Sequence, residues 1–154
     1  MPCEKLIKFL DDNRVKYITI THSQAFTSQQ IAASAHIKGK DLAKTVIIVV
    51  NNRLGMAVLP ANKHVDFQLI RELTGSSDAR LAQEQEFKEL FPDCELGAMP
   101  PFGNLYGMDV FVSDGLECEE TISFNAGNHA ELIQLPYKDF VKLVNPHTLK
   151  FEAV

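Results

Sequence analysis

Residues 45–60, TVIIVVNNRLGMAVLP, decide the fold. The first six residues form an uninterrupted apolar run, which is typical of a strand covered on both faces. The next five, NNRLG, are turn-forming, and MAVLP at 56–60 continues as a second strand. The stretch therefore predicts a hairpin at the centre of a buried sheet.

The segments before this hairpin predict a helix, a strand and a second helix. The first helix follows Pro2 and carries apolar residues at helical spacing. The strand covers residues 15–21, which are rich in β-branched and aromatic side chains, and it ends near His22. The second helix starts at Thr27 with a capping-box pattern and stops at Gly39.

The segments after the hairpin predict a helix capped by Asp66 and ended by Gly75, and another helix over 83–91. A loop follows at 94–104, then strands over 105–112, 121–125 and 130–135, and a short helix over 137–144 closes the chain. Helices and strands alternate irregularly, and strands cluster late. We therefore expect an α+β fold in which residues 1–154 form one compact domain, with a central mixed sheet flanked by helices.

Composition narrows the classes of function. The net charge is −5, which argues against binding nucleic acid through the overall field, and we expect no DNA partner. The three cysteines, Cys3, Cys94 and Cys118, are far apart and fit neither a disulfide framework nor a zinc site; the histidines lack metal-ligand spacing. Phosphate-loop patterns are absent. We expect no metal and no cofactor.

The chain shows no signal-peptide pattern and no apolar run of membrane-spanning length. A cytoplasmic protein with no membrane partner is the expectation.

Lys44 stands immediately before the buried run, so its ammonium should lie at the end of a core strand. It either holds a phosphate or a developing oxyanion through charge-assisted hydrogen bonds, or it extends past the strand end to solvent. Lys38 and Lys40 lie close by in sequence and form the most basic stretch, which is either an RNA contact or a solvated surface.

The loop at 97–103, GAMPPFG, has two prolines that fix the backbone and a glycine at each end. Its N–H groups are candidates to stabilise the oxyanion formed when water attacks an ester. The alternative is an ordinary connection with Phe102 in the core. The candidate substrate-binding residues here are Ala98, Met99, Pro100, Phe102 and Gly103, beside Gly97 and Pro101.

The segment FNAGNH, 124–129, puts polar side chains on either side of a turn, where His129 is a candidate for proton transfer. Asn125 and Gly127 are substrate-binding candidates, with His22 and Thr27 as weaker ones. A structural turn and a surface histidine are the alternative. Phe26, Met99 and Phe102 are either pocket walls or core.

Five segments in order resemble one family: AKTV at 43–46, AVLPA at 57–61, VD at 65–66, ELGAMPPFG at 95–103 and FNAGNH at 124–129. Together they are similar to the YbaK/aminoacyl-tRNA synthetase-associated domain family, which includes prolyl-tRNA editing domains. The resemblance implies a barrel-like mixed sheet. It also implies hydrolysis of mischarged tRNA in trans, removing a small amino acid such as Ala, Cys or Ser, often from the tRNA for proline.

The resemblance also assigns roles. Lys44 matches the lysine that secures the terminal adenosine or its phosphate, with Thr45 next to it, and Gly97 and Pro101 match the loop around the ester. His129 falls where some relatives contact substrate. The implied partner is the CCA end of mischarged tRNA, held by Lys38 and Lys40 or delivered by an aminoacyl-tRNA synthetase. The implied reaction uses water, without metal or covalent intermediate.

Two other functions stay open. One is a non-catalytic module that binds the same aminoacyl or nucleotide-like group. The other is a thiol-dependent hydrolase that uses Cys94 or Cys118.

Overall fold

The structure, a computed structural model, describes residues 3–22, 42–117 and 119–153. Its centre is the expected hairpin: β2 (Ala43–Val50) and β3 (Arg53–Pro60) pair antiparallel along their whole length. Asn51 and Asn52 join them with φ angles of 54° and 64°, as in a type I′ turn, which asparagine tolerates better than most residues. The turn is thus shorter than predicted, and residues 53–55 begin β3.

The hairpin lies in a five-stranded mixed sheet with the order β5-β2-β3-β6-β9. β5 (Ala79–Leu81) pairs antiparallel with β2, whereas β6 (Asp109–Ser113) and β9 (His147–Leu149) run parallel to their neighbours. In the described residues β5 and β9 are edge strands, so the sheet is open. The α+β class and the mixed sheet are confirmed, and the barrel-like description holds only loosely.

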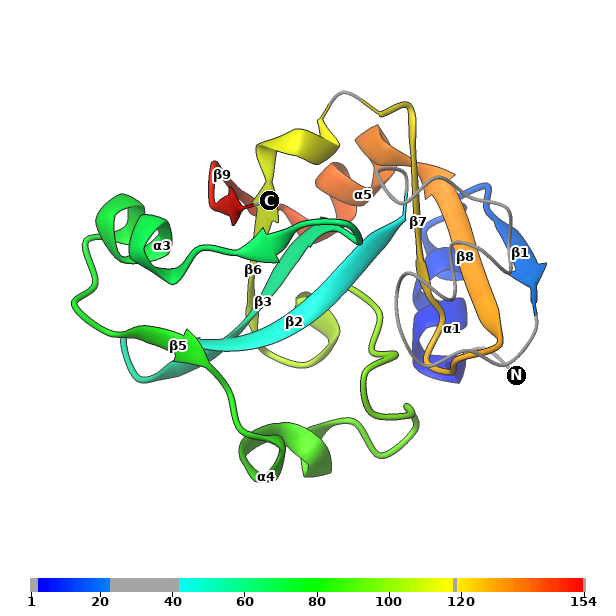
Figure 1. Cartoon of the computed structure of the whole chain (residues 1–154). Coiled ribbons are helices and arrows are strands. Elements are labelled where there is room, and N and C mark those ends of the chain that lie inside the picture. The colour runs from blue at the N-terminus through cyan, green and yellow to red at the C-terminus, as the bar shows by residue number, and fades with distance from the viewer. Residues whose placement is uncertain (1–2, 23–41, 118, 154) are drawn as a thin grey trace.

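Two smaller sheets complete the architecture (Figure 1). One is antiparallel with the order β1-β8-β7, formed by β1 (Ile18–Thr21), β8 (Glu131–Pro136) and β7 (Thr121–Asn125). The other pairs β4 (His64–Val65) with β10 (Glu152–Ala153). A parallel bridge between Leu42 and Ser123 connects the start of β2 to β7.

The α-helices are α1 (Glu4–Asp12), α3 (Phe67–Thr74), α4 (Glu84–Phe87) and α5 (Tyr137–Val144), with short 3-10 turns at Lys88–Leu90, Gly103–Leu105 and Asp114–Leu116. The predicted caps of α3 are confirmed: the Asp66 carboxylate accepts a hydrogen bond from the Leu69 N–H at 3.2 Å, and Gly75 ends the helix with φ 73°. The helix expected over 83–91 is interrupted after Phe87. The helix expected between Thr27 and Gly39 lies outside the described residues.

The core has two parts, one on each face of the five-stranded sheet. Ile47 and Val49 of β2 face the larger part, which includes α1, α5 and the three-stranded sheet. Ile48 between them faces the smaller part, which includes Ile70 of α3 and Phe151. This division explains why the β2 sequence is apolar without alternation.

Two predictions near the end of the chain are wrong. The strand expected over 105–112 starts only at Asp109, because a 3-10 turn and Gly107, with φ 68°, precede it. The chain also does not close with the helix over 137–144, because β9 and β10 follow it. No helix among the described residues is long and apolar enough to cross a membrane.

Candidate functional site

Lys44 is the second residue of β2 and pairs with Leu59. Its side chain is partly buried, and this burial lowers its pKa from the ordinary value of 10.5. In the described part of the chain, no carboxylate forms an ion pair with its ammonium. A partly buried cation with no counter-ion among the described residues is a candidate to bind an anionic group, because the ligand would supply an opposite charge.

Asn125, at the end of β7, lies on the same face as Lys44. The Leu42–Ser123 bridge is parallel, and Lys44 and Asn125 each stand two residues beyond it, so both point to the same side. The two strands then diverge (Figure 1). Asn125 is 8% exposed, and its Oδ1 is buried with no donor among the described residues. Buried polar atoms are usually hydrogen-bonded, so this oxygen is a candidate acceptor for a ligand or water.

The predicted loop and the predicted turn contact each other directly. The Glu95 N–H donates to the Gly127 carbonyl at 2.8 Å, and the Gly127 N–H donates to the Ala98 carbonyl at 3.0 Å. We call this contact between the loop and the turn the junction. The buried His129 ring completes it, with its Nε2 2.8 Å from the Leu96 carbonyl oxygen. The structure therefore unites GAMPPFG and FNAGNH into one backbone unit.

Glycine is required on both sides of this junction. Gly97 has φ 84°, and a Cβ there would lie 3.5 Å from His129 Cε1. Gly127 has φ 101°, and a Cβ there would lie only 2.9 Å from the Cys3 Cβ. Within the described segments, the N–H groups of Gly97 and Met99 have no acceptor, which makes them candidate donors to a substrate.

Glu95 belongs to this unit but was not predicted as a site residue. Its carboxylate accepts a hydrogen bond from the His129 N–H at 3.2 Å and lies 3.8 Å from His129 Nε2. The sequence signal was only its position at the start of ELGAMPPFG. Its role depends on a contact across 34 residues, which sequence spacing does not reveal.

Several predicted loop residues have core side chains. Phe102 is fully buried, with its ring centroid 5.4–6.1 Å from those of Phe9, Phe124 and Phe140. Met99 is 4% exposed and packs in the same core. A Cβ at Gly103 would lie 2.6 Å from the Met108 carbonyl oxygen, so close packing explains this glycine. The remaining loop side chains, Ala98, Pro100 and Pro101, are also buried.

The other predicted residues lie farther from this arrangement or outside the described chain. Thr45 alternates with Lys44, so its side chain points to the opposite face of β2. The His22 N–H donates to the Ala130 carbonyl at 2.9 Å, which places its backbone next to the 125–129 turn. Four predicted site residues lie outside the described residues: Phe26, Thr27, Lys38 and Lys40.

The environment of Cys94 does not favour a thiol nucleophile. Burial raises its pKa to about 12, so the thiol is protonated near neutral pH. Its hydrogen-bonding neighbours are Asp93 and Tyr106, neither of which is a histidine base. Cys118 lies outside the described residues.

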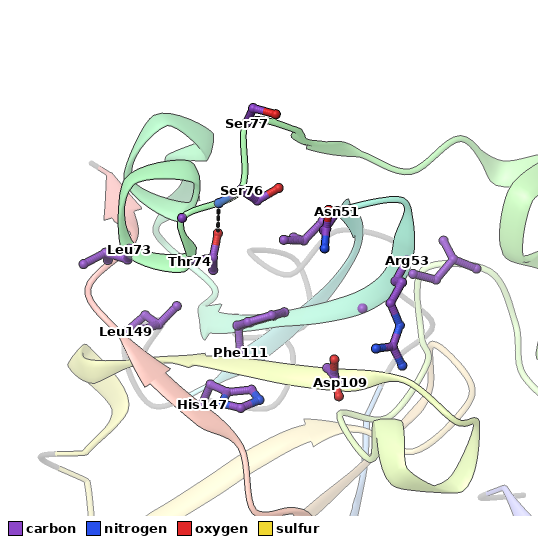
Figure 2. Close-up of a pocket in the computed structure, with 14 residues that line it drawn as sticks. Asn51, Arg53, Leu73, Thr74, Ser76, Ser77, Asp109, Phe111, His147 and Leu149 are labelled. Atoms are coloured by element: carbon purple, nitrogen blue, oxygen red, sulfur yellow. Dashed lines mark hydrogen bonds between the residues drawn. The ribbon is translucent and has the colours of Figure 1, made fainter.

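A separate cavity of about 520 Å³ lies at the other end of the five-stranded sheet (Figure 2). Arg53 and Asp109 lie on one side, and the rings of Phe111 and His147 form part of the wall, tilted by 30° with their centroids 5.4 Å apart. None of the predicted site residues lines it.

Comparison with known proteins identifies one family. The aminoacyl-tRNA editing domain model matches residues 22–143. None of the curated protein sequences matches the chain.

Solved structures share the fold at low sequence identity. Hypothetical protein APE2540 is 19% identical with a TM-score of 0.86, and the match covers 97% of this chain and all of that one. A candidate trans-editing enzyme for prolyl-tRNA synthetase is 15% identical with a TM-score of 0.82, over 99% of this chain and 97% of that one. A candidate signal transduction protein from Marinobacter aquaeolei VT8 is 18% identical with a TM-score of 0.77, over 97% of this chain and 30% of that one.

Proposed function

This chain belongs to the aminoacyl-tRNA editing domain family, and from that premise we propose that residues 1–154 act as one deacylase domain that hydrolyses the ester bond of mischarged tRNA. The environment of the Lys44 side chain is the observation that carries the proposal. Lys44 is a partly buried cation with a lowered pKa and no carboxylate partner in the described residues. The terminal adenosine phosphate of tRNA would supply an anion, which the described residues do not provide.

The reaction proposed is direct attack of water on the ester carbonyl. The open N–H groups of Gly97 and Met99 are the donors proposed for the oxyanion, because backbone amides held by a rigid junction need no reorganisation during the reaction. The buried Oδ1 of Asn125 accepts from the substrate, either from the α-ammonium or from the ribose. The 2′-hydroxyl of the terminal ribose assists the water or the leaving group.

His129 is proposed to position this loop and to contact the substrate. Its ring packs against Gly97, with Cε1 3.5 Å from the position that a Cβ of residue 97 would occupy, and its Nε2 contacts the Leu96 carbonyl oxygen. Moving this ring would therefore move the backbone that holds the ester. A change of loop position by about 1 Å is enough to cost about 100-fold in rate.

The proposed substrates carry a small amino acid, Ala, Cys or Ser, and the proposed carrier is the tRNA for proline. Exclusion of larger side chains by steric contact is the proposed basis of selectivity, since one methylene group is worth only about 1–3 kcal/mol in a pocket. An aminoacyl-tRNA synthetase that delivers the tRNA is a proposed partner, because the acidic chain offers little general attraction for RNA.

The test is release of labelled amino acid from Ala-, Cys- and Ser-tRNA for proline, with correctly charged prolyl-tRNA as a comparison and a chelator present throughout. We expect the wild type to hydrolyse at least one mischarged species and Lys44→Ala to lose about 100-fold or more in rate. Lys142→Ala, which removes an exposed lysine of α5, is the matched control and should retain full activity.

A non-catalytic module is the second candidate, favoured by the same open groups that would bind a substrate. It predicts tight binding of mischarged tRNA to the wild type, loss of that binding in Lys44→Ala, and no hydrolysis of any species in the panel. Hydrolysis that persists in Lys44→Ala would overturn the role proposed for this lysine.

A further inference from the structure

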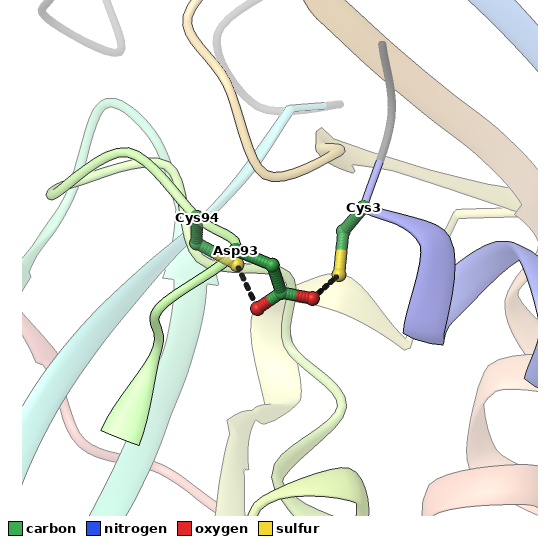
Figure 3. Close-up of side chains that lie close together, drawn as sticks. All are labelled: Cys3, Asp93 and Cys94. Atoms are coloured by element: carbon green, nitrogen blue, oxygen red, sulfur yellow. Dashed lines mark hydrogen bonds between the residues drawn. The ribbon is translucent and has the colours of Figure 1, made fainter. Parts of the chain in front are cut away.

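Three potential metal ligands from two distant parts of the chain meet beside the contact between the loop and the 125–129 turn (Figure 3). They are the thiols of Cys3 and Cys94 and the carboxylate of Asp93, and their ligand atoms all lie within 4.8 Å of one another. Figure 3 shows the carboxylate between the two sulfurs, with one oxygen toward each. Cys3 Sγ lies 2.9 Å from Asp93 Oδ2, and Cys94 Sγ lies 3.8 Å from Asp93 Oδ1.

The three ligand atoms are close enough together for one tetrahedral zinc ion once the carboxylate turns. Zinc binds thiolate sulfur at about 2.3 Å and carboxylate oxygen at about 2.0–2.2 Å, so neighbouring ligand atoms in a tetrahedral site are about 3.6–3.8 Å apart. The Cys94 sulfur already has this separation from Asp93 Oδ1, whereas the Cys3 sulfur lies closer to the other oxygen, Oδ2, so the carboxylate must turn to present one oxygen to an ion between both sulfurs. We propose that Cys3, Asp93 and Cys94 bind one Zn²⁺ ion through two thiolates and one carboxylate.

The surroundings suit this ligand set. The Tyr106 hydroxyl lies 3.6 Å from Cys3 Sγ and 3.7 Å from Cys94 Sγ, where it can donate a hydrogen bond to a metal-bound thiolate. Two thiolates, one carboxylate and one dication carry a net charge of −1. Lys5 brings a positive charge to the Tyr106 ring, with its Nζ 4.7 Å from the ring centroid.

The site also has an access route for the ion and space for a fourth ligand. An open depression of about 360 Å³ is lined by Asp93 and Cys94 together with Pro92, Glu95, Gly127 and Asn128. It gives the ion access to two of the three ligands, whereas Cys3 is 3% exposed and closes the inner side. Water from this depression would complete the tetrahedron.

The ion would hold two segments together. Cys3 precedes α1, and its N–H donates to the Ala126 carbonyl at 2.7 Å. Asp93 and Cys94 lead into the loop through Glu95, which binds Gly127. Zinc would thus join the start of α1 to the backbone unit of the candidate site. The three ligands are not among the groups proposed to hold the ester, so we expect the proposed hydrolysis to proceed with a chelator present.

The experiment measures zinc uptake by the full chain, stripped of metal and kept reduced with a non-chelating phosphine, in competition with a coloured chelator. We expect one Zn²⁺ per chain. Cys3→Ser and Cys94→Ser should each weaken binding by about 100-fold or more, and Asp93→Asn by about 10-fold or more. Cys118→Ser, which changes the third cysteine, is the matched control and should bind as the wild type does.

Cobalt provides a readout on the wild type that does not depend on the folding of any variant. Co²⁺ in this site should show intense tetrahedral d–d bands and a thiolate-to-metal charge-transfer band, and Zn²⁺ should displace both. The proposal is overturned if the reduced wild type takes up no more zinc than Cys3→Ser/Cys94→Ser. Cobalt bound without a thiolate band, or uptake lost equally in Cys118→Ser, would also overturn it.

Discussion

Lys44 imposes a cost on the folded state, because its ammonium is partly removed from water and no carboxylate compensates it in the described residues. Lys44→Met keeps the length of the side chain and removes the charge. We expect the free energy of unfolding, measured in urea, to stay equal or to rise by up to about 1 kcal/mol. Deacylation should fall by about 100-fold or more. A clearly less stable variant would mean that Lys44 is there to support the fold.

The lowered pKa of Lys44 also predicts how stability depends on pH. The unfolded chain holds the proton up to about the ordinary pKa of 10.5, whereas the folded chain releases it at a lower pH. In that window the unfolded state binds more protons, so the contribution of this group to stability rises with pH. At pH values below this range, Lys44 is charged in both states, and its burial lowers the stability of the folded state by the full amount.

The measurement is a pair of urea unfolding curves at several pH values, for the wild type and Lys44→Met. We expect any advantage of Lys44→Met to be constant at neutral pH and to shrink as pH approaches 10.5, because the wild-type lysine then becomes neutral in the folded state. An advantage that grows over this range would contradict the direction of the shift.

At the scale of elements, the junction between the loop and the 125–129 turn depends on Gly127. A Cβ there meets the Cys3 Cβ at 2.9 Å and also needs φ 101°, whereas Gly75 has φ 73° with no atom within 4 Å of an added Cβ. Gly75→Ala therefore measures left-handed strain alone, about 1 kcal/mol. We expect Gly127→Ala to cost about 3 kcal/mol or more. Thermal unfolding of both variants checks this, and equal costs would mean that Cys3 moves aside freely.

The length of an element and its local sequence signals explain which elements were predicted from sequence. The β2–β3 hairpin and the capped helix after Asp66 were predicted because apolar runs, turn residues and caps are local signals. The strands β4, β5, β9 and β10 have only two or three residues, too few for a pattern to appear, and they form because partner strands are already in place.

The candidate site shows the same division. Its glycines and histidine stood out as motifs in the sequence, whereas three features depend on long-range contacts that no local pattern encodes. These are the seating of His129 on the loop, the Glu95 contact and the meeting of Cys3 with Cys94.

At the scale of the whole molecule, the last residues of the described chain complete the smaller core. Phe151 is fully buried there, and its carbonyl accepts a hydrogen bond from the Asp66 N–H at 2.7 Å, just before α3. We expect Phe151→Ala to lower the free energy of unfolding by about 3–5 kcal/mol. Leu73→Ala removes an exposed apolar side chain of α3 and should cost less than about 1 kcal/mol. Urea unfolding compares the two, and similar losses would show that the final strands do not support the core.

The acidic charge of the whole chain limits how tRNA can bind. With a net charge of −5, attraction for phosphates must come from a few local lysines, so few counterions are released on binding. We expect log K for tRNA to fall with log salt with a slope of about −2 or shallower, as for three or fewer phosphate contacts at about −0.7 each. Lys38→Ala/Lys40→Ala should weaken binding and make the slope shallower by about 1. Lys138→Ala/Lys142→Ala removes the same charge from α5 and should leave the slope unchanged. A wild-type slope steeper than about −4, or equal effects of the two pairs, would mean that RNA contacts a much wider surface than the basic stretch before β2.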